Sequence, residues 1–126
     1  MIVESSGMTR SEKRIAEIES LFRNVNERIA TAAENYKVES AEFFCECHDP
    51  ACSERVVVPL DEYERVRSEG TRFVHASKHV EPEFERVVAR RPRYAVVQKF
   101  GRRLTEIVHR LDPRRGPAAA SDEQSF

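Results

Sequence analysis

The sequence has no tryptophan, and aromatic residues of all kinds make up only 8% of its 126 residues. Charged residues account for 34% of the chain and hydrophobic residues for 40%. We therefore expect a small hydrophobic core and a heavily solvated surface. The length suits one domain with short arms, which excludes a two-domain cofactor enzyme.

Long hydrophobic runs are also absent. Charges interrupt every apolar run within a few positions, so no window approaches the roughly 18 apolar residues of a membrane-spanning helix. The first ten residues lack the basic-then-apolar order of a signal peptide and do not resemble a transit peptide. These absences predict a cytoplasmic protein that does not span a membrane.

Motifs of the common enzyme classes are missing as well. The sequence contains no P-loop, no G-x-G-x-x-G and no nucleophile elbow, and its cysteine spacing differs from that of the zinc deaminases. The acidic residues Glu62, Glu64 and Glu69 are typical of a solvated helix face. We predict that the protein is not an enzyme.

A long amphipathic helix is predicted over residues 9–37, after a disordered segment at residues 1–8. Its apolar residues recur at alternating intervals of three and four, which is the spacing of a helical seam. At ~1.5 Å per residue, such a helix is about 40 Å long, longer than the body of a small domain. The seam packs either on the chain's own body or on a partner protein. A second copy of the chain, in a homodimer, is one such partner. The candidate partner-binding residues are Ile15, Ile18, Phe22, Val25 and Ile29.

Residues 39–112 are predicted to form the folded body, and residues 113–126 a disordered tail. A short helix is expected at residues 60–67, strands at 55–58 and 72–76, a hairpin within 84–100 around Arg91-Pro92, and a last helix near 104–111. The predicted fold class is α+β, with a long N-terminal helix, a small antiparallel sheet with a hairpin on its C-terminal side, and a zinc-stabilised knuckle.

The three cysteines, Cys45, Cys47 and Cys52, lie within eight residues. An odd number of cysteines is a poor disulfide framework, whereas three thiolates on a turn supply three of the four ligands that structural zinc requires. The fourth ligand has four candidates, of which His79 fits best because its loop can fold back to the turn, with His75 as the alternative. The remaining candidates are His48, which is too close to Cys47, and His109, on the last helix.

A redox-active thiol is the competing interpretation of this cluster. Acidic neighbours such as Glu46 and Glu54 raise the pKa of a thiol, which disfavours a reactive thiolate when no metal is bound. Three thiolates and one imidazole also fill the zinc sphere and leave no position for water. The sequence therefore favours a closed, structural zinc site.

An ordered set of motifs extends from about Phe22 to Lys99. The motifs are Phe22-Arg23-Asn24-Val25-Asn26-Glu27, Phe43-x-Cys45-Glu46-Cys47 with Cys52, Glu62-Tyr63-Glu64-x-Val66-Arg67, Arg72-Phe73-Val74, His79, Glu85-Arg86-Val87-Val88 and Tyr94-x-Val96-Val97-x-Lys99. This set resembles an uncharacterised family of small bacterial proteins with a Phe-x-Cys-Glu-Cys…Cys…His zinc motif. That family usually has Pro-Gly-His where this chain has Ser77-Lys78-His79. The resemblance implies the same four zinc ligands and no reaction.

The near-zero net charge of −1 conceals a division along the chain. Residues 39–70 carry a net charge of −6, whereas residues 84–115 carry +7. The basic half either pairs with the acidic half or contacts the phosphates of a nucleic acid. The candidate phosphate contacts are Arg90, Arg91, Arg93, Arg102 and Arg103.

Two functions are compatible with these features. The first is a non-enzymatic zinc-binding protein that acts as an interaction or regulatory module through its long helix. The alternative is a small DNA- or RNA-binding protein that uses the basic hairpin.

Overall fold

The structure is a computed structural model that describes the backbone of residues 2–114 and the side chains of residues 12–114. The backbone of residues 2–8, for which disorder was predicted, belongs to the first helix, and the disorder predicted beyond residue 114 concerns positions outside the described residues. Within that part, no helix combines the length and the hydrophobicity that crossing a membrane requires.

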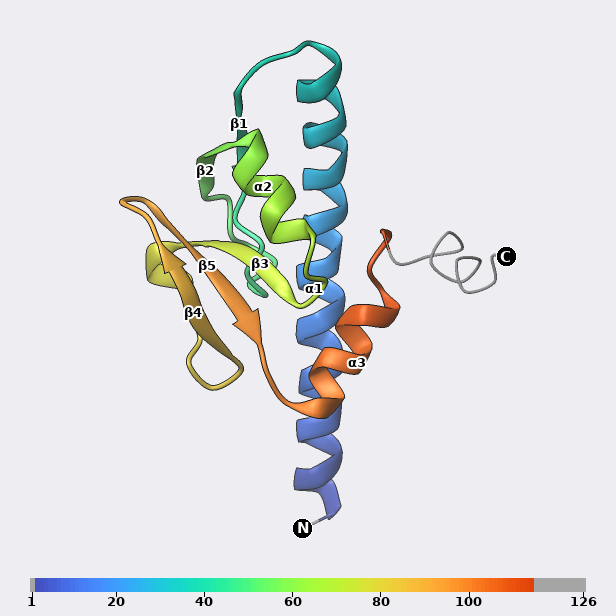
Figure 1. The fold of residues 1–126 in the computed structure, drawn as a ribbon. Coiled ribbons are helices and arrows are strands. Elements are labelled where there is room, and N and C mark those ends of the chain that lie inside the picture. Colours follow the sequence, from blue (N-terminus) through green and yellow to red (C-terminus); the bar gives the residue numbers. More distant parts are fainter. Residues whose placement is uncertain (1, 115–126) are drawn as a thin grey trace, which may run out of the picture.

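The described residues form an α+β fold, as predicted (Figure 1). The long helix α1 runs beside two small sheets, and it packs against β1, α2 and α3. The elements in chain order are α1 (Ile2–Asn35), β1 (Ser40–Phe44), β2 (Arg55–Pro59), α2 (Leu60–Arg67), β3 (Arg72–Ala76), the 3-10 helix η1 (Ser77–His79), β4 (Glu85–Arg90), β5 (Tyr94–Lys99) and α3 (Arg102–Arg110).

The strands divide into two antiparallel sheets. One sheet pairs β1 with β2, with Phe43 opposite Val56. The other has the order β3-β5-β4, so that the predicted hairpin is formed by β4 and β5. Alternation of buried Val56 and Val58 with exposed Val57 shows that β2 turns one face to the core.

Two apolar clusters fill the interior. The first lies between the two-stranded sheet and α2, where the rings of Phe43 and Tyr63 stack with centroids 4.3 Å apart. The second lies between α1, α3 and the three-stranded sheet, and it contains Ile15, Phe73 and Leu104. These clusters hold the two sheets and the helices in fixed positions around the cysteine-bearing loop.

The face that α1 turns toward the body differs from the predicted seam. Ile15 is buried, but Ile18, Phe22 and Ile29 are only half-buried and Val25 is 38% exposed. The buried face also includes the polar residues Glu19, Arg23 and Asn26, which are 0% exposed. The helix therefore packs through a mixed polar and apolar surface and leaves part of its apolar seam open.

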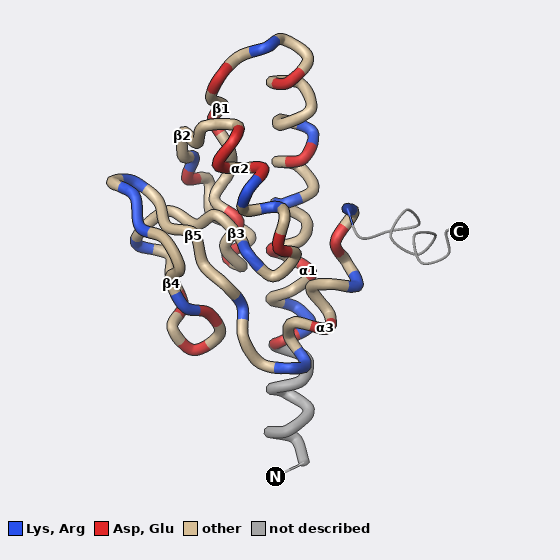
Figure 2. Tube along the Cα trace, viewed as in Figure 1, with Lys and Arg blue, Asp and Glu red and all other residues tan. Residues whose placement is uncertain are grey.

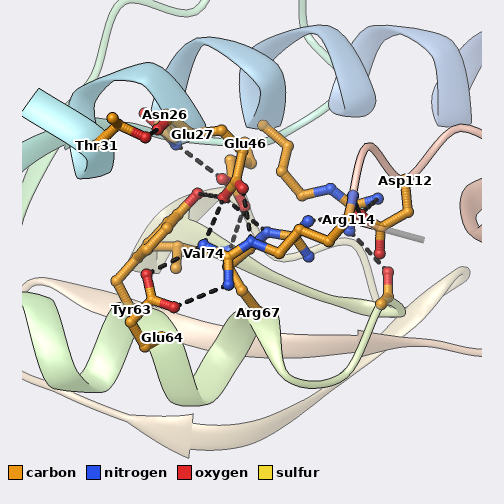
Figure 3. Close-up of polar contacts among 12 residues, drawn as sticks. Asn26, Glu27, Thr31, Glu46, Tyr63, Glu64, Arg67, Val74, Asp112 and Arg114 are labelled. Carbon is orange, nitrogen blue, oxygen red and sulfur yellow. Dashed lines mark hydrogen bonds and ion pairs between the residues drawn. The ribbon is translucent and has the colours of Figure 1, made fainter. Parts of the chain in front are cut away.

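A buried ionic network joins α1, α2 and the end of α3 (Figure 3). The Arg67 guanidinium is 2.9 Å from Glu27 Oε2 and 2.5 Å from Asp112 Oδ1. The Tyr63 hydroxyl donates to the same Glu27 oxygen at 2.6 Å. Arg23 lies 4.0 Å from Asp112 and also donates to the Gly70 carbonyl oxygen at 2.7 Å. The network satisfies charges that would otherwise be buried without partners.

Arg114 extends this network to the surface. Its guanidinium is 2.6 Å from Glu27 Oε1 and 2.8 Å from Glu64 Oε1 (Figure 3). The sequence predicts a disordered tail over residues 113–126, whereas Arg114 in the structure is bound to α1 and α2. The contact draws the end of the described chain against the body.

The C-terminus of α1 ends in a left-handed residue. Lys37 has φ +58°, and the bonds from Lys37 N to Glu34 O and from Val38 N to Ala33 O have the pattern of a Schellman motif. Because glycine adopts this conformation without strain, Lys37→Gly should stabilise the protein by about 0.5–1 kcal/mol. Urea unfolding measures the change, and a Lys37→Ala variant without a gain serves as the control. A less stable Lys37→Gly protein would contradict this account of the cap.

Candidate metal centre

The four residues predicted to bind zinc come together in space. Cys45 follows β1, Cys47 and Cys52 lie in the connection between β1 and β2, and His79 is the last residue of η1. One ligand atom from each of these residues lies within 4.8 Å of the ligand atoms of the others. Cys45 and Cys47 are buried, whereas Cys52 and His79 are partly exposed.

The connection between β1 and β2 folds back on itself through backbone hydrogen bonds. The Cys45 amide donates to the Glu54 carbonyl at 3.0 Å, which closes the base of the loop. At its tip, Asp49 Oδ1 accepts from the Ala51 amide at 2.9 Å, and the Asp49 carbonyl accepts from the Cys52 amide at 3.0 Å. This aspartate turn returns Cys52 to the side of the loop that holds Cys45.

Glu46 fixes the cysteine loop to the neighbouring elements. Its amide donates to the Val74 carbonyl at 2.8 Å, and its Oε1 accepts from the Val74 amide at 2.9 Å. Its Oε2 accepts from Asn26 at 2.8 Å (Figure 3), and Asn26 also exchanges two hydrogen bonds with the backbone of Phe44. Burial raises the pKa of Glu46. The loop is thereby held against both β3 and α1.

The distances fit a tetrahedral metal ion. His79 Nδ1 lies 3.4 Å from the sulfurs of both Cys45 and Cys52. Ligands at zinc–sulfur and zinc–nitrogen distances of ~2.3 and ~2.0 Å lie roughly 3.5 Å apart in a tetrahedron. The Ala76 amide donates to Cys45 Sγ at 3.1 Å, a contact that stabilises a thiolate ligand. All three cysteines are free thiols, so the donor set suits a thiophilic metal.

The pKa values of the three thiols are shifted in different directions. A hydrogen bond from the Cys45 thiol lowers the pKa of Cys47 to about 5, and the same contact raises the pKa of Cys45. Burial raises the pKa of Cys52. Acidic neighbours were expected to raise the pKa of the thiols, but at Cys47 the hydrogen bond from Cys45 lowers it. Metal binding requires deprotonated thiols, and Cys47 is the cysteine whose pKa is lowered.

The other histidines lie outside this cluster. His75, the alternative fourth ligand, points into a separate buried group with Glu19 and Glu85. His48 faces Glu19, and His109 is exposed on α3.

Sequence reasoning missed Glu19, Glu85 and their partner Lys99. The only signal was that Glu19 lies four residues after Ile15, on the helix face that carries apolar residues.

The five arginines proposed to contact phosphate form two groups. Figure 2 shows basic residues gathered at the β4–β5 turn, where Arg90 and Arg93 are exposed and Arg91 is 2.6 Å from Glu62. The other two lie at the start of α3, where Arg102 is 3.7 Å from Glu106 and Arg103 is 3.8 Å from Glu12. Three of the five are thus paired with acidic side chains.

Comparisons with protein-family models, with curated proteins and with solved structures find no match to this chain. The resemblance to the family of small bacterial proteins therefore stays a prediction from the sequence motifs. The geometry of the cysteine cluster stands on its own as evidence for a metal centre.

Proposed function

We propose that the protein is a non-enzymatic zinc-binding protein that acts as an interaction or regulatory module through α1. The observation that carries the zinc assignment is the convergence of Cys45, Cys47, Cys52 and His79 within 4.8 Å. Three thiolates and an imidazole form a closed structural zinc set, in which no position is left for a reacting water. Their charge also makes the metal a weak Lewis acid, which supports a structural role.

The origin of the ligands supports the same role. Three of them belong to the connection between β1 and β2, whereas His79 follows β3 of the other sheet. A bound ion would therefore join the two sheets where they meet, at the apolar cluster that contains Phe43. The reducing cytoplasm suits such a site, because it keeps the three cysteines as thiols.

Cobalt substitution tests the zinc site directly. Protein loaded with Co²⁺ should show the strong charge-transfer absorption of thiolate ligands, and zinc-loaded protein should contain at least one Zn²⁺ per chain by elemental analysis. Cys47→Ser should weaken the absorption, and His109→Gln, at an exposed histidine outside the site, should leave it unchanged. The absence of thiolate absorption in the unmodified protein would refute the assignment.

The exposed part of the α1 seam supports the interaction role. Leu21 is 61% exposed and Val25 is 38% exposed, one helical turn apart. The half-buried side chains of Ile18 and Phe22 lie beside them on the helix. This strip of four residues, which we call the α1 strip, suits the apolar face of another helix. A second copy of the chain offers such a face, so the simplest partner is the protein itself.

Charge insertion tests self-association through the α1 strip. The unmodified protein should dimerise, and Leu21→Glu or Val25→Glu should weaken the dimer by at least tenfold because each buries a carboxylate at the contact. Asn24→Glu adds the same charge at an exposed position on the same helix and should have little effect. Sedimentation equilibrium measures the constants. An unmodified protein that stays monomeric at high concentration would exclude the dimer.

A further inference from the structure

A second group of ionisable side chains is buried beside the cysteine cluster. Glu19 of α1, His75 of β3 and Glu85 of β4 each offer a ligand atom within 4.8 Å of the other two. Lys99, at the end of β5, completes the group. Glu19 and His75 are 0% exposed, and Glu85 and Lys99 are 1% exposed. Four such side chains are buried together only when their charges are balanced.

The charges within this group are not balanced by Lys99 alone. Its ammonium lies 2.7 Å from Glu19 Oε1, donates to Glu19 Oε2 at 2.7 Å, and also contacts Glu85 Oε1. Two carboxylates with one ammonium leave an excess negative charge in the interior, which attracts a further cation.

The orientation of His75 leaves one ring nitrogen without a partner. Its Nδ1 lies 3.1 Å from Glu85 Oε2 and 3.3 Å from the His79 carbonyl oxygen, and a hydrogen on Nδ1 suits both acceptors. The Nε2 atom is buried without any hydrogen-bond partner. A histidine whose Nδ1–H is held by a carboxylate and whose Nε2 is free has the arrangement of a metal ligand.

Two further potential ligand atoms lie near His75 Nε2, one from Glu19 and one from His48. Glu19 Oε2 is 3.8 Å from His75 Nε2 and 3.8 Å from His48 Nδ1, which is also buried without a hydrogen-bond partner. These separations are too long for hydrogen bonds, but two ligands that each lie ~2.1 Å from a tetrahedral metal are roughly 3.4 Å apart. A small rotation of His48 would complete the approach.

His48 also provides access from solvent. Its side chain is 32% exposed, and it lines a pocket of about 150 Å³ that it shares with Cys47 and His79 of the cysteine site and with Asp49, Lys78 and Glu81. The pocket gives solvent access to the His48 ring, whose Nδ1 lies 3.8 Å from Glu19 Oε2. The partly exposed ring is free to close behind the ion.

We propose that Glu19, His48 and His75 bind a second divalent transition-metal ion beside the cysteine site. Glu85 is a positioning residue that fixes the His75 ring, and Lys99 holds the two carboxylates in place. Two imidazoles and one carboxylate suit Fe²⁺, Co²⁺ or Zn²⁺, and they leave coordination positions open toward the pocket. The assignment rests on atoms of its own and does not depend on metal at the cysteine cluster.

Metal counting with a spectroscopic reporter tests this site. Full-length protein dialysed against a small excess of Co²⁺ should bind two ions per chain, of which one shows thiolate absorption. His75→Gln and His48→Gln should each bind one ion per chain, with the thiolate absorption unchanged. His109→Gln, on the exposed face of α3, is the matched control and should still bind two.

The outcomes separate the two sites. One ion per chain with thiolate absorption in the unmodified protein would overturn the second site and leave the cysteine site intact. Two ions in His75→Gln or in His48→Gln would also overturn it. A single ion without thiolate absorption would instead refute the cysteine site. If the buried His75→Gln protein fails to fold, the partly exposed His48 position still gives the result.

Discussion

Removal of the metal by a chelator should unfold the body of this protein at temperatures at which the metal-bound form is stable. The four ligands of the cysteine cluster come from the connection between β1 and β2 and from η1, which follows β3. Loss of the ion would separate these segments and leave the charge of the Cys47 thiolate without its counter-ion. Structural zinc contributes about 10–16 kcal/mol to the folding of zinc-finger peptides.

Two apolar clusters also stabilise this chain, so the loss should be smaller than in a zinc finger. We expect a loss of about 4 kcal/mol, which corresponds to a fall in Tm of roughly 20 °C for a domain of this size. Circular dichroism melts with and without chelator measure it. His79→Gln should reproduce the fall without chelator, and His109→Gln should not. Coincident melts with and without metal would show that the site is not structural.

Asp112→Ala should cost about 3–5 kcal/mol, because it removes the acidic partner of two buried arginines. Asp112 Oδ1 lies 2.5 Å from Arg67 and 4.0 Å from Arg23, and both arginine side chains are 0% exposed. Arg67 retains Glu27, but Arg23 retains only carbonyl oxygens and the ring of Phe73, 4.2 Å from its guanidinium carbon. Urea unfolding gives the free energy.

Glu64→Ala is the matched control for Asp112→Ala. Glu64 also pairs with an arginine, at 2.8 Å from Arg114, but its side chain is 51% exposed. Its removal should cost no more than about 1 kcal/mol, because water solvates both charges when the pair is lost. Equal costs for the two variants would show that burial of the arginines is not what makes the network stabilising.

The same network predicts the direction of the pH dependence. Burial alone would raise the pKa of Asp112, but the hydrogen bond from Arg67 lowers that pKa below its ordinary value. A carboxyl with a lowered folded-state pKa stabilises the protein above its unfolded-state pKa of about 4, and the stabilisation disappears as pH falls through the folded-state value. The difference in stability between the unmodified protein and Asp112→Ala should therefore shrink below about pH 4.

Local signals were sufficient to predict α2 and the β4–β5 hairpin. Pro59 before the helix and acidic residues in its first turn mark the start of the observed span Leu60–Arg67, and Ser68 caps its end. The division of the strands into two sheets had no such signal, because the pairing of β1 with β2 and of β3 with β5 depends on contacts between distant segments.

The cysteine site was predictable because three of its ligands lie within eight residues of the sequence. The fourth, His79, lies in the connection between β3 and β4. The Glu19 group was not, since Lys99 is 80 positions from Glu19 in the sequence. Each of these charges alone resembles an ordinary surface residue. The buried face of α1 was misjudged for the same reason, because heptad spacing counts apolar residues and cannot show that Arg23 and Glu19 have buried partners.

The polar face of α1 also determines when the chain can complete its fold during synthesis. Arg23 contacts the Val108 carbonyl across 85 positions, and its acidic partner is Asp112. Since the ribosome releases α1 first, the helix has to wait for nearly all of the remaining described residues before this face can be covered. Charged side chains remain hydrated during that interval, so a nascent helix with this face resists aggregation better than one with a wholly apolar face.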